Sequence, residues 1–72
     1  MIEELSRIDI DCVENYANAN MRARTAAKKM HYDRRTISYH FDRVQKATGL
    51  DPRNFHDLCR LVQKINEWKG EM

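Results

Sequence analysis

Hydrophobic residues recur along this chain at spacings of three, four and seven, which is the pattern of helices that bury one face. The first predicted helix begins at about Asp9 or Asp11, either of which can act as its N-cap, and ends at about Ala19. Its buried stripe comprises Ile10, Val13 and Ala17, with Tyr16 beside it. A second predicted helix covers about 22–30, and Asn20 is a candidate cap for it. Its buried stripe comprises Ala23, Ala26, Ala27 and Met30.

A three-residue turn separates the second predicted helix from a longer third one. His31 follows the second helix, and because histidine tolerates positive φ we expect it to end that helix in the left-handed conformation. Asp33 is a good N-cap and predicts a third helix over 34–48, which Gly49 ends. The buried stripe of this helix comprises Ile37, Phe41, Val44 and Thr48. Its opposite face carries Arg35, Tyr39, Asp42 and Lys46.

Asn54 predicts the start of a fourth helix that runs to about Trp68, with Asp57 at its third position as in a capping box. The expected buried stripe comprises Phe55, Leu58, Cys59, Val62 and Ile65. Leu61, with Trp68, widens the apolar face on one flank. The pattern therefore predicts an all-α fold, in which a homeodomain-like three-helix core is followed by a C-terminal helix.

The composition fits one small helical domain. The chain has 72 residues, of which 42% are hydrophobic and 33% charged, and its two Gly and one Pro leave little punctuation for hairpins. We expect the domain to cover 9–69, with an N-terminal extension at 1–8 and a C-terminal tail at 70–72. A core of this size has no room to enclose a cofactor pocket, so neither an enzyme nor a bound cofactor is expected.

The cysteines, the histidines and the lack of long apolar runs argue against a disulfide-linked, metal-binding or membrane protein. Cys12 and Cys59 are expected to stay reduced and to behave as small hydrophobic residues, with a disulfide between them as the alternative. His56 and Cys59 lie three residues apart, but no second pair stands at ligand spacing, so no metal site is expected. The first residues of the sequence lack the apolar run of about 7–15 residues that is typical of a signal peptide, and no apolar stretch approaches the roughly 20 residues that cross a bilayer. We therefore expect a cytoplasmic protein without a membrane partner.

Charge is segregated along the chain. Residues 1–20 carry five acidic residues against one arginine, whereas 21–46 carry eight Lys and Arg against two Asp, a net charge of +6. The charges of 47–72 sum to zero. A basic middle segment suggests a polyanionic partner, although basic runs also cover solvated helix faces.

A short helix, a three-residue turn and a longer helix with a basic outer face form a helix-turn-helix arrangement, here at about 22–48. Such a unit places its second helix, here about 34–48, in the major groove of duplex DNA while the first crosses the phosphates. The expected base contacts are Arg35, Ser38 and Tyr39. The expected phosphate contacts are Arg24, Thr25, Lys28, Arg34, Thr36 and Arg43. Thr36 is expected to use both its hydroxyl and its backbone N–H.

The run TAAKKMHYDRRTISYHFDRVQKATGLD at 25–51 resembles the C-terminal helix-turn-helix of PucR-type and sugar-diacid-type bacterial transcriptional regulators. The residues identical to that family's pattern are Ala27, Lys28, Arg34, Thr36, Tyr39, Arg43 and the run Thr48-Gly49-Leu50-Asp51. The resemblance covers about 11–68. It implies a sequence-specific DNA-binding module of bacterial transcription, associated with the nucleoid and related to Fis-type helix-turn-helix domains.

The chain departs from the family pattern at three places. Met21-Arg22 stands where the family has Gly-Asn, Arg35 where it has Asn, and Ser38 where it has Arg. The base preference of relatives therefore does not transfer. Larger relatives also carry a sensing domain, so we expect either the DNA-binding part of a larger regulator or a stand-alone protein, with no small-molecule effector site in this chain.

Two other functions compete with duplex DNA binding. A protein-interaction module, such as an adaptor or anti-repressor, can use the helix-turn-helix shape without DNA, but it has no need for so many cations. Single-stranded RNA binding is less favoured because only Tyr32 and Tyr39 offer rings for stacking.

One helix-turn-helix reads only a few base pairs, so a homodimer on a two-fold site is expected. Its expected contacts are Leu61, Ile65 and Trp68. The alternative is that these three side chains pack within the chain, against Ile8, Ile10 and Val13.

Overall fold

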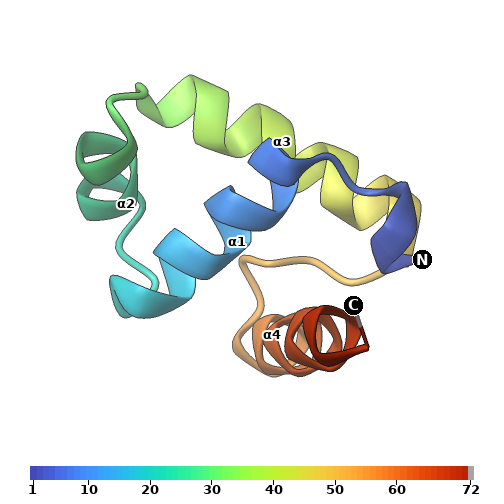
Figure 1. The fold of residues 1–72 in the computed structure, drawn as a ribbon. Coiled ribbons are helices and arrows are strands. Elements are labelled where there is room, and N and C mark those ends of the chain that lie inside the picture. The colour runs from blue at the N-terminus through green and yellow to red at the C-terminus, as the bar shows by residue number, and fades with distance from the viewer. Residues whose placement is uncertain (72) are drawn as a thin grey trace.

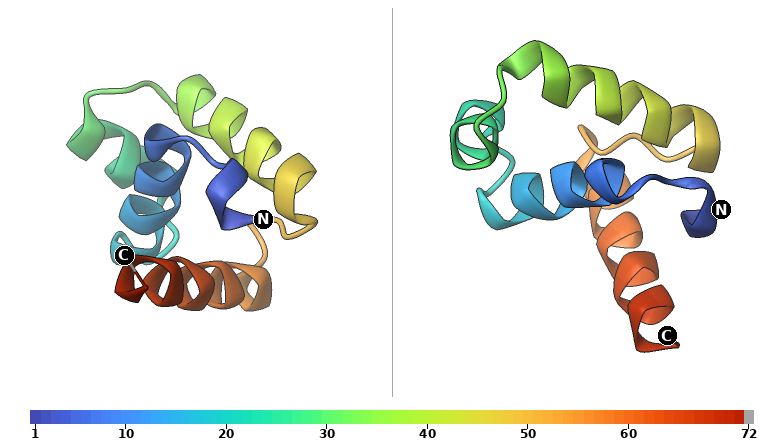
Figure 2. Two further views of the ribbon diagram at one scale, coloured as in Figure 1. Left: turned by 45° about the vertical axis from the view of Figure 1, so that its right-hand side comes forward. Right: turned by 45° about the horizontal axis from the view of Figure 1, so that its top comes forward.

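A computed structural model describes residues 1–71, in which four α-helices enclose one hydrophobic core (Figure 1). A 3-10 turn, η1 (Ile2–Glu4), precedes the helices, which are α1 (Arg7–Asn18), α2 (Ala23–Met30), α3 (Arg34–Thr48) and α4 (Phe55–Gly70). The helix α1 contacts each of the other three helices. The views in Figure 2 show α3 on one side of α1 and α4 on the other. The prediction of a small all-α domain is confirmed.

The start of α1 differs from the prediction, because Ser6 is its N-cap and neither Asp9 nor Asp11 is. The Ser6 hydroxyl accepts a hydrogen bond from the Asp9 N–H (3.1 Å), and the Asp9 carboxylate accepts one from the Ser6 N–H (3.0 Å). This reciprocal capping box extends the helix to Arg7. The segment before it also joins the core, since Ile2 and Leu5 are buried and η1 packs on α4.

The connection between α1 and α2 uses two left-handed residues, Asn20 (φ 55°) and Met21 (φ 64°). Arg22 is the N-cap of α2 and its side chain makes no cap hydrogen bond, so the prediction that Asn20 caps this helix is wrong. A left-handed backbone suits glycine, which the family carries where this chain has Met21. The Met21 side chain packs against the core, and this contact offsets a conformational cost of about 1 kcal/mol.

The predicted bounds of α3 are confirmed at both ends. The Asp33 carboxylate accepts hydrogen bonds from the N–H groups of Arg35 (2.8 Å) and Thr36 (3.1 Å). His31 ends α2 at φ 60° and Gly49 ends α3 at φ 76°, both in the left-handed conformation. The predicted inner stripes of α2 and α3 also face the core, which includes Ala26, Ala27, Ile37, Phe41 and Val44.

Asn54 caps α4 as predicted, accepting a hydrogen bond from the Asp57 N–H (3.0 Å), but the buried face of this helix differs from the prediction. Its buried residues are Leu58, Leu61 and Ile65. Phe55 is 60% exposed and Cys59 lies on the surface, so the prediction that they belong to the core is wrong. The helix carries two overlapping apolar stripes, and packing on α1 buries only one of them.

The packing of α4 on α1 also determines whether the expected dimer contacts are accessible. Leu61 and Ile65 are both 0% exposed, so neither has surface to offer a second copy, and their assignment as dimer contacts is wrong. They share one core cluster with Ile10 and Val13 of α1, as the alternative expected, but Ile8, the third residue of that alternative, is 42% exposed. Trp68 is half-buried and packs against this cluster as well.

The two cysteines have different environments. Cys12 is 0% exposed in α1, Cys59 is exposed on α4, and both are free thiols. Burial raises the pKa of the Cys12 thiol to about 11, and the charges of Asp9 and Asp11 act in the same direction. Cys12 is therefore both inaccessible and held in its unreactive protonated form.

We expect one of the two thiols to react with a colorimetric disulfide reagent in the native protein at neutral pH. The reactive thiol is Cys59, and the second equivalent should appear only after unfolding in urea, because the thiolate of Cys12 is disfavoured and covered. The Cys59→Ser variant serves as the control and should show no native reaction. Two equivalents reacting at one rate in the native protein would contradict this packing of α1.

Candidate nucleic-acid interface

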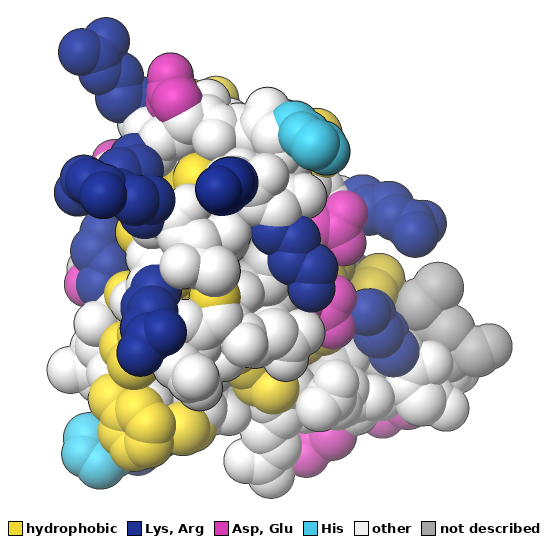
Figure 3. Space-filling model, turned by 90° about the vertical axis from the view of Figure 1, so that its left-hand side faces the viewer, with side chains coloured by type: hydrophobic (Ala, Val, Ile, Leu, Met, Phe, Trp, Pro, Cys, Tyr) yellow, Lys and Arg dark blue, Asp and Glu magenta, His cyan; other side chains and the backbone are white. Residues whose placement is uncertain are grey.

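The outer surface of α2, of the turn 31–33 and of the start of α3 is basic. Ala26 and Ala27 lie on the buried face of α2, and their small side chains let this helix pack closely against α1 and α3. The polar residues of α2 consequently point outward, among them Arg24, Thr25 and Lys28. Figure 3 views the molecule from the side of α2 and shows Lys and Arg side chains gathered over its upper part.

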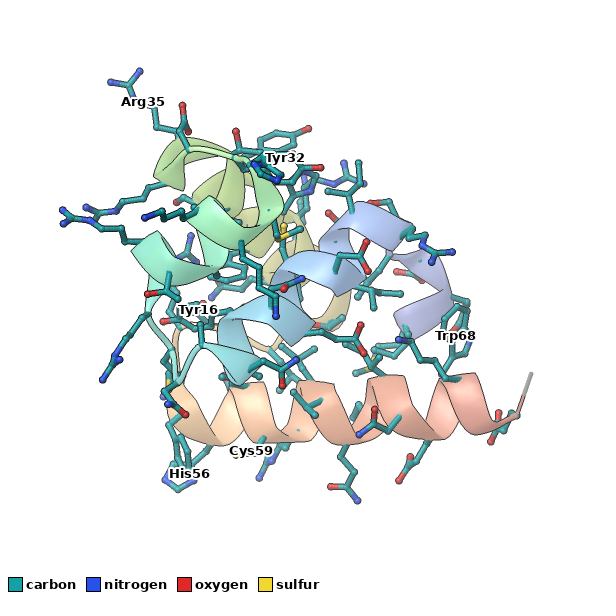
Figure 4. The ribbon with its side chains drawn as sticks, turned by 60° about the vertical axis from the view of Figure 1, so that its left-hand side comes forward. Tyr16, Tyr32, Arg35, His56, Cys59 and Trp68 are labelled. Atoms are coloured by element: carbon teal, nitrogen blue, oxygen red, sulfur yellow. The ribbon has the colours of Figure 1, made fainter. Side chains whose placement is uncertain are left out.

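Four cations surround a hollow in this surface, between α2 and the start of α3. They are Arg24, Lys28, Arg34 and Arg35, and the hollow is also lined by Ala27, Tyr32 and Asp33. Among the described residues 1–71, none of the four forms an ion pair, although other basic side chains do. Figure 4 shows Arg35 extending away from the body of the protein. These guanidinium and ammonium groups are therefore available to an external anion.

The structure brings two of the three predicted base-reading residues to one accessible strip. Arg35 is exposed near the start of α3, and Tyr39 is 59% exposed one turn further on. The Tyr39 ring meets the neighbouring His40 ring edge to face, with 5.1 Å between centroids. Lys46 is exposed toward the far end of α3.

Two other predicted contact groups already have partners within the chain. The Thr36 N–H donates to the Asp33 carboxylate, so the prediction that this N–H binds a phosphate is wrong. The Ser38 hydroxyl accepts a hydrogen bond from Nη2 of Arg53 (3.0 Å), a residue of the connection between α3 and α4. No local pattern in the sequence points to Arg53, since only the return of the chain toward α3 brings it there.

Arg43, a predicted phosphate contact, is paired with a buried carboxylate. Asp9 is 0% exposed and accepts hydrogen bonds from Nδ1 of His40 (2.6 Å) and Nε of Arg43 (3.3 Å). Burial by itself raises the pKa of Asp9, but the hydrogen bonds from His40, from Ser6 and from Arg43 outweigh it and lower the pKa below its usual value. Because an ionised carboxylate only accepts, His40 carries its proton on Nδ1.

This Asp9 cluster fixes one flank of α3. The side chain of Arg43 remains 47% exposed, so it can still reach a phosphate with its outer nitrogens. The pairing of Asp9 with His40 and Arg43 cannot be predicted from a local sequence pattern, because the two residues stand 31 and 34 positions from Asp9. The Ser6-x-x-Asp9 capping spacing was the one available signal that Asp9 has a special place.

Other kinds of site are not seen in the described part of the chain. Residues 1–71 contain no group of three His, Cys, Asp or Glu side chains placed to hold a metal ion. None of their helices is both long and apolar enough to cross a membrane.

Two helices joined by a three-residue turn, with a basic and accessible second helix, define a helix-turn-helix domain. The family model of the PucR C-terminal helix-turn-helix domain matches residues 9–63, which is most of the chain. The chain therefore belongs to this family, and the resemblance stated from the sequence is confirmed. Searches of curated proteins and of solved structures found no match.

We expect Asp9→Asn to lower the free energy of unfolding at pH 7 by about 2 kcal/mol, since it weakens charged hydrogen bonds to His40 and Arg43. The pKa of Asp9 is lower in the folded protein than in the unfolded chain, where it is about 3.9. The stabilisation is therefore present above about pH 4 and is lost as the pH falls through the folded value. Urea unfolding of the two proteins should show their difference shrinking below about pH 4.

Asp11→Asn is the matched control. Asp11 lies two residues away on α1, is half-buried and forms no ion pair among residues 1–71. This control should stay within about 0.5 kcal/mol of the wild type. A difference between Asp9→Asn and the wild type that is unchanged from pH 7 to pH 3 would contradict an ionised Asp9.

Proposed function

We propose that this domain binds double-stranded DNA in a sequence-specific manner and acts as a bacterial transcriptional regulator, or as the DNA-binding part of one. The observation that carries the proposal is the group of four cations around the α2–α3 hollow, none of which is paired within residues 1–71, beside the accessible strip of α3. A duplex offers a dense row of phosphates for such cations and a groove that admits one helix. Membership of the PucR C-terminal helix-turn-helix family supports the same function.

In this proposal α3 enters the major groove and α2 lies across the sugar-phosphate backbone. Arg35 offers a bidentate fork to guanine, and Tyr39 reaches a base edge or a phosphate from the same strip. Ser38 also faces a base pair, with a hydroxyl that Arg53 already contacts. The phosphate contacts are Arg24, Thr25, Lys28, Arg34, the Thr36 hydroxyl and Arg43.

The proposal includes a homodimer on a two-fold operator, because one module reads only a few base pairs and two modules together read enough for specific binding. Its contact uses neither Leu61 nor Ile65, since both are enclosed in the core. Such a regulator acts at the nucleoid in the cytoplasm. No step of the proposal needs a cofactor, a metal or catalysis.

We expect duplex binding with a steep dependence on salt. If the four cations assigned to the backbone, Arg24, Lys28, Arg34 and Arg43, each neutralise one phosphate, log K should fall with log salt at a slope of about −4. Fluorescence anisotropy with genomic duplex fragments, measured between low and physiological salt, tests this. A flat salt response or no binding at low salt would refute DNA binding and favour the protein-interaction module.

We expect Arg35→Ala and Lys28→Ala to affect binding differently. Arg35→Ala should weaken binding to the preferred site by about 1–3 kcal/mol and relax the preference at one base pair. Lys28→Ala should weaken all duplexes alike and reduce the salt slope by about 1, because a residue of α2 meets only the backbone. Selection of binding sites from a random library would contradict these roles if Lys28→Ala changed the preferred sequence and Arg35→Ala did not.

A further inference from the structure

We propose that Arg53 is a positioning residue for base reading: it makes Ser38 a hydrogen-bond donor toward the DNA and neutralises Asp42 beside it. This inference rests on the proposed function, and it assigns a role in recognition to a residue outside the helix-turn-helix unit. The proposal follows from the contacts of one guanidinium group.

Arg53 lies in the connection between α3 and α4 and reaches the flank of α3 opposite to the Asp9 cluster. Its Nη2 contacts the Ser38 carbonyl oxygen (3.1 Å), the Ser38 Oγ (3.0 Å) and the Asp42 carboxylate (2.9 Å). Its Nη1 donates to Asp51 (3.1 Å). The guanidinium carbon stands 5.4 Å from the centre of the Phe41 ring. So many simultaneous contacts hold the group in one place.

Arg53 lies on the same surface as the other arginines of the interface. Arg53 lines a hollow together with Arg34, Arg35 and Ser38, and the floor of this hollow includes Phe41. The Arg53 side chain is 35% exposed and Asp42 is 70% exposed. A carboxylate so exposed on the recognition helix would repel phosphates, and Arg53 cancels that charge at close range.

The effect on Ser38 follows from the polarity of its hydroxyl. A hydroxyl has one proton to donate and two lone pairs that accept. When one lone pair accepts from a cation, the O–H is polarised, so the group becomes a better donor and a poorer acceptor. Ser38 otherwise pairs with several bases, since it can donate or accept. With Arg53 in place it favours base-edge acceptors, which are purine N7, guanine O6 and thymine O4.

The test uses Arg53→Met, which keeps the length of the stem over Phe41 and removes the charge and the donors. We expect binding to the preferred duplex to weaken about fivefold, because the Asp42 charge is exposed to the phosphates. We also expect discrimination at one base pair to relax toward bases that present a donor. Ser38→Ala should lose discrimination at that same base pair, and adding it to Arg53→Met should cause no further loss.

Asp42→Asn separates the two effects of Arg53. Added to Arg53→Met, it should restore most of the affinity, because the unscreened charge is gone, but not the discrimination. Arg60→Met is the matched control, because Arg60 is exposed on α4 and forms no ion pair among residues 1–71. Arg60→Met should leave both the affinity and the base discrimination unchanged. Thermal melting monitors the folding of each variant. If Arg53→Met unfolds, Arg53→Lys replaces it in the test. This variant should keep the affinity for DNA and relax the discrimination between bases.

The outcomes distinguish this inference from the proposed function. A wild type that binds no duplex overturns both. A wild type that binds duplex DNA, while Ser38→Ala leaves base preference unchanged, overturns the inference alone. The inference also fails if Arg53→Met and Ser38→Ala act additively at different base pairs, or if Asp42→Asn does not restore affinity, since Arg53 would then contact DNA by itself.

Discussion

The carboxylate of Asp9 is a fully buried charge, and the orientation of α3 depends on how that charge is satisfied. A buried charge is tolerable only when nearly all of its hydrogen-bonding capacity is used. Ser6 meets it from the start of α1, and His40 and Arg43 meet it from the middle of α3. Rotation of α3 about its axis would withdraw both partners, so the cluster selects one rotation of this helix.

The opposite flank of α3 is held by Arg53, which bonds to Ser38 and Asp42. Two sets of polar contacts, one on each flank, thus surround an outer strip that contains Arg35, Tyr39 and Lys46. A side chain that reads base edges needs a fixed helix beneath it, because small misplacements forfeit hydrogen bonds. The flanking contacts supply this rigidity in a domain whose hydrophobic core is small.

The sequence predicts the helices well where their ends depend on neighbouring residues. Asp33, Gly49 and Asn54 place the ends of α3 and the start of α4 because a cap contacts N–H or C=O groups within about four residues. The prediction that Asp9 or Asp11 caps the first helix is wrong, because Asp9 is the third residue of a capping box that begins at Ser6. The prediction that Phe55 and Cys59 lie on the buried face of α4 is also wrong, because two apolar stripes of helical spacing overlap and only contact with α1 selects between them.

For the site, the sequence by itself determined which residues could face a partner: the basic middle segment, the helix-turn-helix spacing and the outward positions of Arg35 and Tyr39. These follow from the 3.6-residue period of a helix and from charge counted along the chain. Only the tertiary structure decided which of the polar groups remain free. Ser38 is engaged by Arg53, and Arg43 by Asp9, across 15 and 34 positions of the chain. Such pairings depend on how helices pack, and no local pattern of residues encodes them.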